Sequence, residues 1–366
     1  LVCIIDRNQK QLDIASDRYK KHKENELICS DSIAALDNVE LDIVIEATGT
    51  PAAGALVAKN VLNRGINLIL LNVETEATIG LALRKEAEKN NAIVTVADGD
   101  EPVAALDLYN FARELSFDVI SIGKGKNNPF DTFATPSSLT KEASLKQMNP
   151  KMLTSFVDGT KTMVEMAALA NFLGFNIDID GMHGIEATYE NINQFYIPKK
   201  DGGLLDESQV VDFAFGIAPG VFAVIYSEDD YVNYEMEYLK MGKGPYWTLA
   251  RPYHLTSLEI PRTIRHIMLE KYSKLSAQSW NVEVVAHAKQ DIEPGTNLGS
   301  IGGDYIYGKA QKTSSSKGLL PIGIAEDNVV TKAIAKGNPI AIDEVDAQDN
   351  ELCEYWDYQN QILDSD

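Results

Sequence analysis

The hydrophobic residues in the first third of the chain fall into short, nearly continuous runs separated by amphipathic stretches. The apolar runs have the length of strands: LVCIID (1–6), ELICS (26–30), LDIVIEATGTP (41–51), INLILLNVE (66–74), AIVTVADGDEP (92–102) and DVISIGKGK (118–126). The stretches between them have helical spacing: QKQLDIASDRYKKH (9–22), GALVAKNVLNRG (54–65) and IGLALRKEAEKNN (79–91). This alternation predicts an α/β fold with a parallel sheet that is covered on both faces.

Polar residues or glycines stand at the carboxyl ends of several of these runs. They are Asp6, the turn 48–51, Asn72, the pair 98–99 and the segment 123–125. Open α/β sheets bind their ligands at this edge, so we expect the functional site there.

Asp6 ends the first run and precedes a helix. In dinucleotide-binding folds an acidic residue in this place binds the ribose 2′-hydroxyl, although Asp6 could equally cap the helix. The Gly-rich phosphate turn should precede such a strand by about 20 residues, and the first strand and this turn are therefore expected to be missing from the chain. Arg7 leaves the choice between NAD and NADP open, because a neighbouring arginine could accept a 2′-phosphate.

A long helix is predicted for NPKMLTSFVDGTKTMVEMAALAN (149–171), with a proline in its first turn. Its polar side is a stripe of charged residues bordered by two hydroxyl residues: Lys151, Asp158, Lys161 and Glu165, with Ser155 and Thr160. The stripe could be a solvated face with ion pairs, or it could face a cleft, which the apolar remainder of the helix favours. A lysine and an aspartate on one rigid element suit carbonyl reduction, since the ammonium can protonate the alkoxide and the carboxylate can position the ammonium.

The middle of the chain contains an irregular Gly-rich segment (181–203), two strands of a hairpin or meander (210–227), and a helix starting near Thr256. Between a turn and this helix stand Arg251 and His254. Arg251 suits a phosphate or carboxylate, with a structural ion pair as the alternative. For His254 the alternative is a histidine satisfied at the helix entry.

The last part of the chain combines short strands with Pro-Gly, Gly-Gly and Lys-Gly turns over 281–347 and predicts a small β-rich unit. The tail 348–366 is acidic and aromatic and is expected to pack on another domain or subunit.

Length, charge and cysteine content limit the number of domains and the classes of partner that the chain can have. At 366 residues, the chain should form two or three domains. A net charge of −21 argues against nucleic acid or an anionic membrane as a partner, and no signal peptide or twenty-residue apolar stretch is present, so a cytoplasmic location is expected. The three cysteines lie far apart and indicate neither a disulfide framework nor a zinc site.

Several motifs together resemble a bacterial family of homoserine-dehydrogenase-like oxidoreductases with a C-terminal SAF domain. This family includes the 1-deoxy-D-xylulose 5-phosphate reductoisomerase-like (type II) enzymes. The motifs are DIVIEATG (42–49), NVETEA (72–77), GDEP (99–102), GKGKNNP (123–129), NPKMLTSFVDGTKTMVEMA (149–167), PYWTLARPYHL (245–255) and the SAF-like AKQDIEPGTNL, IGGDYIYG, LLPIGIAE and IAKGNPI. The resemblance implies a Rossmann NAD(P)-binding domain at 1–125, an α+β substrate-binding and dimerisation domain at 126–280, and a β-clip SAF module at 281–347, followed by the tail.

The resemblance also implies site residues. The cofactor would lie along Asp6, Arg7, Thr48, Gly49, Thr50, Pro51, Asn72 and Glu74. The catalytic residues would be Lys161, Asp158 and Lys124, and the substrate would contact Lys126, Asn127, Lys151, Ser155, Thr160, Arg251, Tyr253 and His254.

The predicted function is NAD(P)H-dependent oxidoreduction of a small anionic hydroxy-carbonyl compound by a homodimer. The substrate could be 1-deoxy-D-xylulose 5-phosphate, and a Mg²⁺ or Mn²⁺ ion would then help; Asp158, Glu165 and Asp98 are the nearest carboxylates, but no spacing specifies a metal. One alternative is a homoserine-dehydrogenase-like enzyme acting on an unphosphorylated substrate. A second is a SAF-based ligand sensor without redox activity.

Overall fold

Parallel strands form in the N-terminal third of the chain in the computed structural model, which describes residues 1–21, 27–346 and 348–365. One parallel sheet has the order β3-β4-β5: β3 (Ile43–Glu46), β4 (Asn67–Leu70) and β5 (Val94–Val96). Two helices connect these strands: α2 (Pro51–Leu62) and α3 (Val73–Lys89). Leu68, Ile69 and Leu70 of β4 are fully buried, as a central strand covered on both faces requires. The prediction of parallel strands alternating with helices is confirmed for this region.

Both connecting helices begin at the carboxyl edge of this sheet. The Thr50 hydroxyl accepts a hydrogen bond from the Ala53 N–H (3.4 Å), and the Asn72 side chain accepts one from the Thr75 N–H (3.3 Å). Each polar side chain thus caps a helix whose first N–H groups have no partner within the helix. The Asn72 amide also donates to the Thr50 carbonyl (2.8 Å) and joins the two turns.

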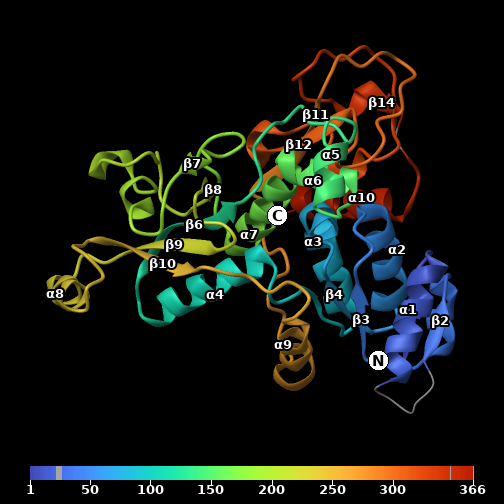
Figure 1. Ribbon diagram of the computed structural model, residues 1–366, viewed down its shortest axis with the longest axis horizontal. Coiled ribbons are helices and arrows are strands. Elements are labelled where there is room, and N and C mark those ends of the chain that lie inside the picture. The colour runs from blue at the N-terminus through green and yellow to red at the C-terminus, as the bar shows by residue number, and fades with distance from the viewer. Residues whose placement is uncertain (22–26, 347, 366) are drawn as a thin grey trace.

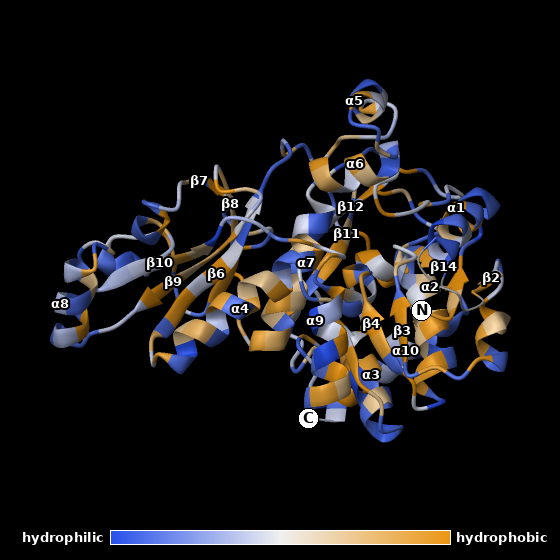
Figure 2. Ribbon diagram, turned by 60° about the horizontal axis from the view of Figure 1, so that its bottom comes forward, coloured by the Kyte–Doolittle hydropathy of each residue, from blue (hydrophilic) through white to orange (hydrophobic). Residues whose placement is uncertain are grey.

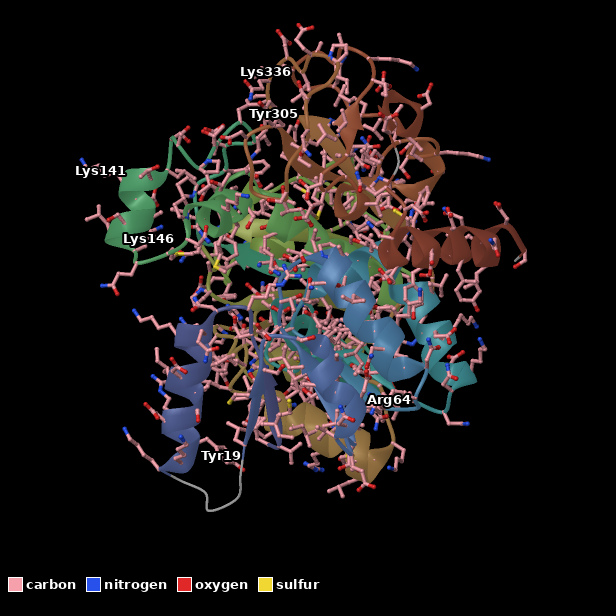
Figure 3. All side chains as sticks on the ribbon, turned by 90° about the vertical axis from the view of Figure 1, so that its right-hand side faces the viewer. Tyr19, Arg64, Lys141, Lys146, Tyr305 and Lys336 are labelled. Carbon is pink, nitrogen blue, oxygen red and sulfur yellow. The ribbon has the colours of Figure 1, made fainter. Side chains whose placement is uncertain are left out.

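The first two strands form a separate parallel pair instead of extending the β3-β4-β5 sheet. They are β1 (Cys3–Ile5) and β2 (Ile28–Ser30), with α1 (Gln9–Lys20) beside them. The Tyr19 hydroxyl donates to the Leu1 carbonyl (3.0 Å) and ties α1 to the start of the strand. Figure 3 shows Tyr19 at the edge of the molecule opposite the labelled Lys336.

The run 118–126 is a strand, but it does not belong to the parallel sheet predicted for it. It forms β6 (Asp118–Lys126) at the centre of a five-stranded mixed sheet. The order is β10-β9-β6-β8-β7, with β7 (Ile185–Glu186), β8 (Val210–Phe215), β9 (Val221–Tyr226) and β10 (Tyr246–Arg251). A Cβ at Gly123 would lie 1.7 Å from the Asp212 carbonyl oxygen, so a glycine is needed for β8 to approach. Apolar continuity indicates burial on both faces but does not identify the neighbouring strands.

Two further predictions are wrong: the hairpin predicted for 210–227 and the single helix predicted for 149–171. The strands in 210–227 form, but they are not a hairpin, because β6 lies between β8 and β9. The helix predicted for 149–171 is two helices, α6 (Pro150–Val157) and α7 (Thr160–Leu173). Gly159 separates them with a φ of +88°, a value that side chains with a Cβ rarely adopt.

Of the remaining helices, α4 (Glu101–Glu114) packs on β6 and β9 of the mixed sheet, and α5 (Thr140–Leu145) packs on α6. The other two are α8 (Asp230–Tyr238) and α9 (Ile260–Arg265), and Ile260 of α9 packs with Ile69 and Ala97 beside the β3-β4-β5 sheet. Short 3-10 turns add η1 (Ile33–Asn38), η2 (Ile192–Gln194), η3 (Lys199–Asp201), η5 (Thr313–Ser315), η6 (Ile322–Ile324) and η7 (Ile342–Glu344), and a π-helix, η4 (His266–Glu270), continues α9. In Figure 1, α4 and α7 lie together against this sheet, while β7 and β8 lie away from α4. The irregular segment 181–203 packs its apolar residues, including Ile192 and Tyr196, on the sheet face formed by Val210 and Phe222.

The C-terminal region is β-rich up to Asp346 and ends in a helix. Its strands form two antiparallel pairs: β11 (Val282–Ala288) with β12 (Ile306–Lys312), and β13 (Val329–Val330) with β14 (Val345–Asp346). The tail forms α10 (Glu351–Ser365), which runs beside α2 and α3 (Figure 1) and buries Leu352 and Tyr355. The tail was expected to pack on another domain or subunit, and in the structure it packs on two helices of the N-terminal third of the chain.

The helix α3 is interrupted at Ile79, whose φ and ψ are −137° and 17°. Gln359 of α10 accepts hydrogen bonds from the Leu81 and Ala82 N–H groups (3.1 and 3.4 Å) and donates to the Thr78 carbonyl (3.1 Å). One side chain from α10 thus satisfies backbone groups that the interruption leaves without helical partners.

In the part of the chain that the structure describes, no helix is both long and apolar enough to cross a membrane. Figure 2 shows β3 and β4 mostly in orange, the colour of hydrophobic residues.

Candidate active site

Two parts of the fold meet through one ion pair at the carboxyl edge of the β3-β4-β5 sheet. The Lys161 ammonium, at the start of α7, lies 2.9 Å from a Glu74 carboxylate oxygen at the start of α3. Glu74 follows Asn72, which joins the turns after β3 and β4. A cationic side chain is therefore held beside the edge at which α/β sheets bind ligands.

A second lysine extends this contact into a buried network. The Lys124 ammonium on β6 lies 2.7 Å from a Glu101 oxygen at the start of α4 and in short contact with Glu165 of α7. Glu165 is also 3.9 Å from the Lys161 ammonium. The side chains of Lys124 and Glu165 are 8% and 2% exposed, whereas that of Lys161 is 18% exposed and is the most accessible of the three. Lys161 is thus the ammonium nearest to an incoming ligand.

Carboxylates outnumber ammonium groups in this network. Asp100, Glu101 and Glu165 place one oxygen each within 4.8 Å of one another, and Glu74 adds a fourth carboxylate beside Lys161. Burial and the nearby Glu101 raise the pKa of Glu165 to about 7, and burial raises the pKa of Asp100 well above its usual range. Near neutral pH some of these carboxyls therefore hold protons.

The same carboxylates keep both lysines charged. Burial alone lowers the pKa of Lys161, but Glu74 and Glu165 outweigh it and the pKa lies above its ordinary value. Burial likewise lowers the pKa of Lys124, and Glu101 and Glu165 raise it further than burial lowers it. The site holds two fixed ammonium groups that can donate hydrogen bonds or a proton to a ligand oxygen.

Asp158 does not position Lys161, and this prediction is corrected. It lies at the junction of α6 and α7, where it is fully buried and 2.8 Å from the Lys289 ammonium, which is also buried. Asp158 also accepts a hydrogen bond from the Thr160 N–H (2.8 Å). Because the helix is broken, Asp158 does not lie on the same face as Lys161. Glu74 and Glu165 lie beside the Lys161 ammonium, where Asp158 was expected.

Arg251 takes part in an ion-pair cluster outside this network. Its guanidinium is in short contact with Glu259, lies 3.6 Å from Asp107, and stacks over the Tyr253 ring with 4.7 Å to the ring centre. This is the structural ion pair named as the alternative for Arg251. A role for Arg251 or the half-exposed Tyr253 in holding a substrate remains a prediction.

His254 lies closer to the network than Arg251 does. Its Nε2 atom is 3.5 Å from Glu101, and its Nδ1 atom is 3.2 Å from the Gly99 carbonyl and 3.1 Å from the Thr256 hydroxyl. The predicted helix after it begins at Ile260 instead of Thr256. His254 therefore contacts both the carboxyl edge after β5 and the first turn of α4.

The other predicted substrate residues are placed differently. Lys126 is buried beside the network, donates to the Phe156 carbonyl and lies over the Phe130 ring, and burial followed by the nearby Lys124 lowers its pKa to about 8. Asn127 is exposed at the end of β6. The remaining three serve the packing of α6 and α7 against the β-rich region or α6 itself: Lys151 donates to Ser300 (3.2 Å), Thr160 accepts from the Gly308 N–H (2.8 Å) and Ser155 donates to the Met152 carbonyl (2.8 Å).

The predicted cofactor residues lie along the carboxyl edge of the strands. Thr48 donates from both its N–H (2.6 Å) and its hydroxyl to Glu46, whose other carboxylate oxygen is buried and has no hydrogen-bond partner among the described residues. A Cβ at Gly49 would meet no atom within 4 Å, so the turn before Pro51 faces open space. Such a turn, followed by the N-termini of α2 and α3, presents backbone N–H groups that fit a phosphate group of a dinucleotide.

Asp6 and Arg7 are exposed after β1. Asp6 accepts a hydrogen bond from the Asn8 N–H (2.8 Å), and Asn8 is the residue that caps α1. The helix-cap interpretation is thus wrong for Asp6 itself, and its role toward a ribose remains a prediction. Among the predicted cofactor residues, Glu74 is the one that contacts Lys161 directly.

Sequence reasoning missed Asp100 and Glu101 as site residues. Both stand in GDEP, at the carboxyl end of β5 and the start of α4, a place that the strand pattern marks as the ligand edge. Asp98, considered for a metal, instead lies near Thr263, which donates to it (2.9 Å), and Arg262.

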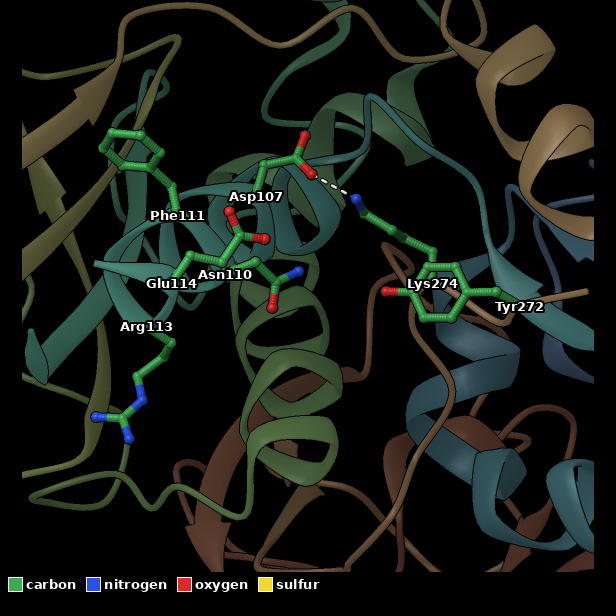
Figure 4. A pocket seen from close by; sticks show the side chains of 7 residues that line it. All are labelled: Asp107, Asn110, Phe111, Arg113, Glu114, Tyr272 and Lys274. Carbon is green, nitrogen blue, oxygen red and sulfur yellow. Dashed lines mark ion pairs between the residues drawn. The ribbon is translucent and has the colours of Figure 1, made fainter. Parts of the chain in front are cut away.

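An open cavity of about 760 Å³ lies apart from this network, between α4 and the segment after η4. Its lining residues are Asp107, Asn110, Phe111, Arg113, Glu114, Tyr272 and Lys274 (Figure 4). Both cations that line it are already paired: the Lys274 ammonium is 2.5 Å from Asp107, and the Arg113 guanidinium is 3.1 Å from Asp118. The buried network of convergent charged groups lies elsewhere, at Lys124 and Lys161.

Comparison with known families assigns most of the chain to two matched segments. Residues 1–97 match the family model for the NAD binding domain of homoserine dehydrogenase, and residues 99–260 match the model described as the catalytic domain of oxidoreductase DRL. The division falls between β5 and α4. No curated protein matches the chain.

Solved structures give distant likenesses. The WlbA dehydrogenase of Chromobacterium violaceum, solved with NADH and UDP-GlcNAcA, is 17% identical, with 38% of this chain and 39% of that chain covered and a TM-score of 0.29. An oxidoreductase of Agrobacterium radiobacter, solved with NAD+, L-tartaric acid and magnesium, is 16% identical, with 36% and 38% covered and a TM-score of 0.28. An oxidoreductase of Bacteroides fragilis is 13% identical, with 76% and 83% covered and a TM-score of 0.34.

This chain spans about two-fifths of the length of the first of these structures. Likenesses at this level carry no argument about its chemistry. The two family models carry such an argument, because both describe domains of oxidoreductases. The model matched by residues 1–97 also names NAD as the bound cofactor.

Proposed function

We propose that this chain, an NAD(P)-dependent oxidoreductase by both family matches, acts on a small hydroxy-carbonyl compound bound between the carboxyl edge of β3-β4-β5 and the start of α7. The observation that carries the proposal is the contact between Lys161 and Glu74. It places a charged ammonium from the region matched to the catalytic domain beside the helix start where the cofactor domain would receive the nicotinamide.

The bound NAD(P) would supply or accept the hydride. Residues 48–51 and Asn72 would hold its nicotinamide half through the turns and helix N-termini at this edge. Two observations support this assignment: one buried oxygen of Glu46 has no hydrogen-bond partner in the described part of the chain, and the space beside Gly49 is open. Asp6 would contact the ribose, with Arg7 beside it, and these two residues leave NAD and NADP as alternatives.

Lys161 would donate a proton from Nζ to the carbonyl oxygen as the hydride arrives and take the proton back in the reverse direction. Glu74 and Glu165 would position the ammonium and keep it protonated, the role predicted for Asp158. Lys124 would stabilise negative charge on the same oxygen from the other side of Glu165.

The class of substrate separates two versions of this proposal. In the reductoisomerase-like version the substrate is a keto-phosphate such as 1-deoxy-D-xylulose 5-phosphate. Its anionic end would meet Lys126, which has no carboxylate within ion-pair distance in the described part of the chain. A Mg²⁺ or Mn²⁺ ion would fit Asp100, Glu101 and Glu165, although it would compete with the Lys124 ammonium for the last two.

The excess of carboxylates favours the second version, a homoserine-dehydrogenase-like enzyme. An amino-acid substrate carries an ammonium group, and Asp100 or Glu165 could bind it without a metal ion. The sensor alternative predicts no hydride transfer and gives no role to two lysines held charged at the ligand edge. The SAF assignment of the β-rich region, the homodimer and the cytoplasmic location remain predictions of the resemblance.

The test is hydride transfer by the purified full chain, followed by nicotinamide absorbance with NADH and with NADPH. The substrates are 1-deoxy-D-xylulose 5-phosphate with and without Mn²⁺, an amino-acid semialdehyde, and short polyols in the oxidative direction. Turnover of the keto-phosphate only with Mn²⁺ supports the first version, and metal-independent turnover of the semialdehyde supports the second. Binding of NAD(P)H without turnover of any of these compounds would overturn the proposal in favour of the sensor.

A further inference from the structure

We infer that the β-rich region 281–346 positions the Lys161–Glu74 ion pair, because it holds the first turns of both helices that carry this pair. The inference rests on the proposed function, since the position of the pair matters for catalysis only if Lys161 is the proton donor. Both family matches end before this region, the second at residue 260, so they assign it no role. Its main positioning residue is Lys289.

The first contact is a buried ion pair at the junction of α6 and α7. The Lys289 ammonium, directly after β11, is 2.8 Å from one carboxylate oxygen of Asp158, and the two side chains are 1% and 0% exposed. The other Asp158 oxygen accepts a hydrogen bond from the Thr160 N–H (2.8 Å). Thr160 and Lys161 are the first two residues of α7. Asp158 thus connects Lys289 to the backbone that carries Lys161 and acts on that backbone, not on the Lys161 ammonium.

The strand β12 bonds to the same turn directly. The Gly308 N–H donates to the Thr160 hydroxyl (2.8 Å). A Cβ at Gly308 would lie 3.0 Å from the Thr160 methyl group and 2.8 Å from the Val284 side chain, so a glycine is needed for β12 to approach α7 this closely. Lys289 also donates to the Gly303 carbonyl (2.8 Å) and so connects the segment before β12 to this contact.

The β-rich region also contacts the helix that carries Glu74. Its 3-10 turn η6 packs on α3. A Cβ at Gly323 of η6 would lie 1.8 Å from the Thr78 hydroxyl oxygen, so the two residues are in close contact. The Thr78 hydroxyl in turn donates to the Glu74 carbonyl (2.6 Å). One region of the chain therefore holds the first turns of α7 and α3.

The start of α7 needs this support because of the residue that precedes it. Gly159 is the N-cap of α7 and has no side chain that could accept a hydrogen bond from the first turn. Glycine also restricts the backbone less than any other residue. Asp158 and the β-rich region supply the contacts that Gly159 does not. A misplacement of about 1 Å can cost about 10²-fold in rate, so these contacts affect catalysis through Lys161.

The test is Lys289→Met in the full chain, assayed with NADPH and the substrate that the hydride-transfer assay identifies. The change removes the connection to Asp158 and should let the start of α7 shift. We expect kcat to fall by about 10²-fold, with KM and the Kd for NADPH unchanged, because proton donation by Lys161 acts in the transition state. Rates are compared at a temperature where every variant is folded.

Two further variants separate position from stability. Ile340→Ala is the matched control, because Ile340 is fully buried in the same region and its N–H donates to the Ala286 carbonyl (2.9 Å). It should lower stability about as much as Lys289→Met and leave kcat unchanged. Asp158→Asn combined with Lys289→Met removes both buried charges and regains stability, but its kcat should stay low because the connection to α7 is still missing.

A double-mutant cycle shows whether Lys289 acts through Lys161. In a Lys161→Ala chain, Lys289→Met should cause no further loss of kcat. An additive loss would assign Lys289 another role and overturn the inference. Should Lys289→Met fail to fold, Gly308→Ala replaces it in the same cycle, because its methyl group would push Thr160 and the start of α7 away from β12.

Hydrogen exchange gives a readout that needs no substrate. Exchange at the backbone amides of residues 158–163 should become faster in Lys289→Met and stay unchanged in Ile340→Ala. Unchanged exchange in Lys289→Met, or a kcat equal to that of Ile340→Ala, would overturn the inference. A wild-type chain that turns over none of the tested substrates would instead contradict the proposed function, and the exchange rates would still decide whether the β-rich region holds the start of α7.

Discussion

Two clusters of charged side chains take a carboxylate each from α4 and use it differently. The inner cluster joins Glu101 to the Lys124–Glu165–Lys161 network. The outer cluster joins Asp107 to three cations, and Glu259 and Asp98 complete it. Arg251 contacts Asp107 (3.6 Å) and Glu259, and Lys274 contacts Asp107 (2.5 Å). Arg262 contacts Glu259 (2.5 Å), Asp107 (3.4 Å) and Asp98 (3.7 Å).

The difference lies in charge balance and position. In the outer cluster three cations meet three carboxylates, so each charge is satisfied by the protein itself. In the inner cluster two ammonium groups meet the carboxylates of Glu74, Asp100, Glu101 and Glu165 at the ligand edge. A basic residue near a ligand edge is therefore not sufficient evidence for a binding role; its partners decide whether it is available.

The largest effect should come from Lys161→Ala. Loss of the proton donor should lower kcat/KM by about 10²–10⁴-fold, the usual contribution of a general acid. Steady-state kinetics with the identified substrate measure it. Lys151→Ala is the control, since the Lys151 ammonium contacts Ser300 and should leave kcat/KM unchanged. Near-normal turnover of Lys161→Ala would remove Lys161 from the chemistry.

Next in size is the stability effect of Lys289→Met. This change leaves the Asp158 carboxylate buried without a cation and should lower the free energy of unfolding by about 3–5 kcal/mol. Urea unfolding measures it. The double variant Asp158→Asn with Lys289→Met should recover part of the loss, because no buried charge remains. A change below about 1 kcal/mol in the single variant, the size of an exposed ion pair, would show that the pair is hydrated.

Glu76→Gln tests a buried carboxylate bound by a backbone group instead of an ammonium. Glu76 accepts a hydrogen bond from the Ala277 N–H (2.6 Å), and burial raises its pKa from 4.5 to about 7. The native chain then binds a proton that the unfolded chain has lost, so stability falls as pH rises from 4.5 to about 7 and this contribution is constant above. The shift corresponds to about 3 kcal/mol.

Glu76→Gln should therefore unfold like the wild type near pH 4.5 and be more stable by about 3 kcal/mol at pH 8. Denaturant unfolding at both pH values measures the difference. Parallel stability curves for the two chains would mean that Glu76 is ionised in the native state at neutral pH.

The smallest effect should come from Arg251→Gln. Glu259 and Asp107 already neutralise Arg251, so KM for the substrate should change by less than about 10-fold. If Arg251 instead bound an anionic substrate, losing that charged hydrogen bond would cost about 1.5–3 kcal/mol, which is a rise in KM of more than about 10-fold. Initial rates over a range of substrate concentrations measure KM. A rise well beyond 10-fold with unchanged kcat would restore Arg251 as the substrate anchor.

Local patterns predicted the strands and helices of the first third of the chain, because each depends on neighbouring residues. The apolar run of β6 was equally clear, but its sheet was not, since the partner strand β8 lies far along the chain. The sequence also singled out Lys161 and the carboxyl edge, and the structure brings the two together through Glu74. What it could not supply were the partners, which depend on contacts distant in sequence.

Asp158 shows the reason. Its spacing from Lys161 suits one helix face only if the helix is unbroken, and Gly159 breaks it. Lys289, which pairs with Asp158, stands in the SAF-like part of the sequence, where no local pattern connects it with α6. The GDEP motif did carry a signal for Glu101, because it starts a helix at the end of a strand.

The interruption of α3 at Ile79 makes this helix dependent on a residue 278 positions beyond Leu81. During synthesis, the backbone groups around the interruption must wait for Gln359 to leave the ribosome before they gain these hydrogen bonds. In a chain that ends before α10, these N–H and carbonyl groups would lack the hydrogen bonds that Gln359 provides and would have to bind water instead. The segment matched to the NAD binding domain (residues 1–97), although made before α10, is thus completed only after α10 has been synthesised.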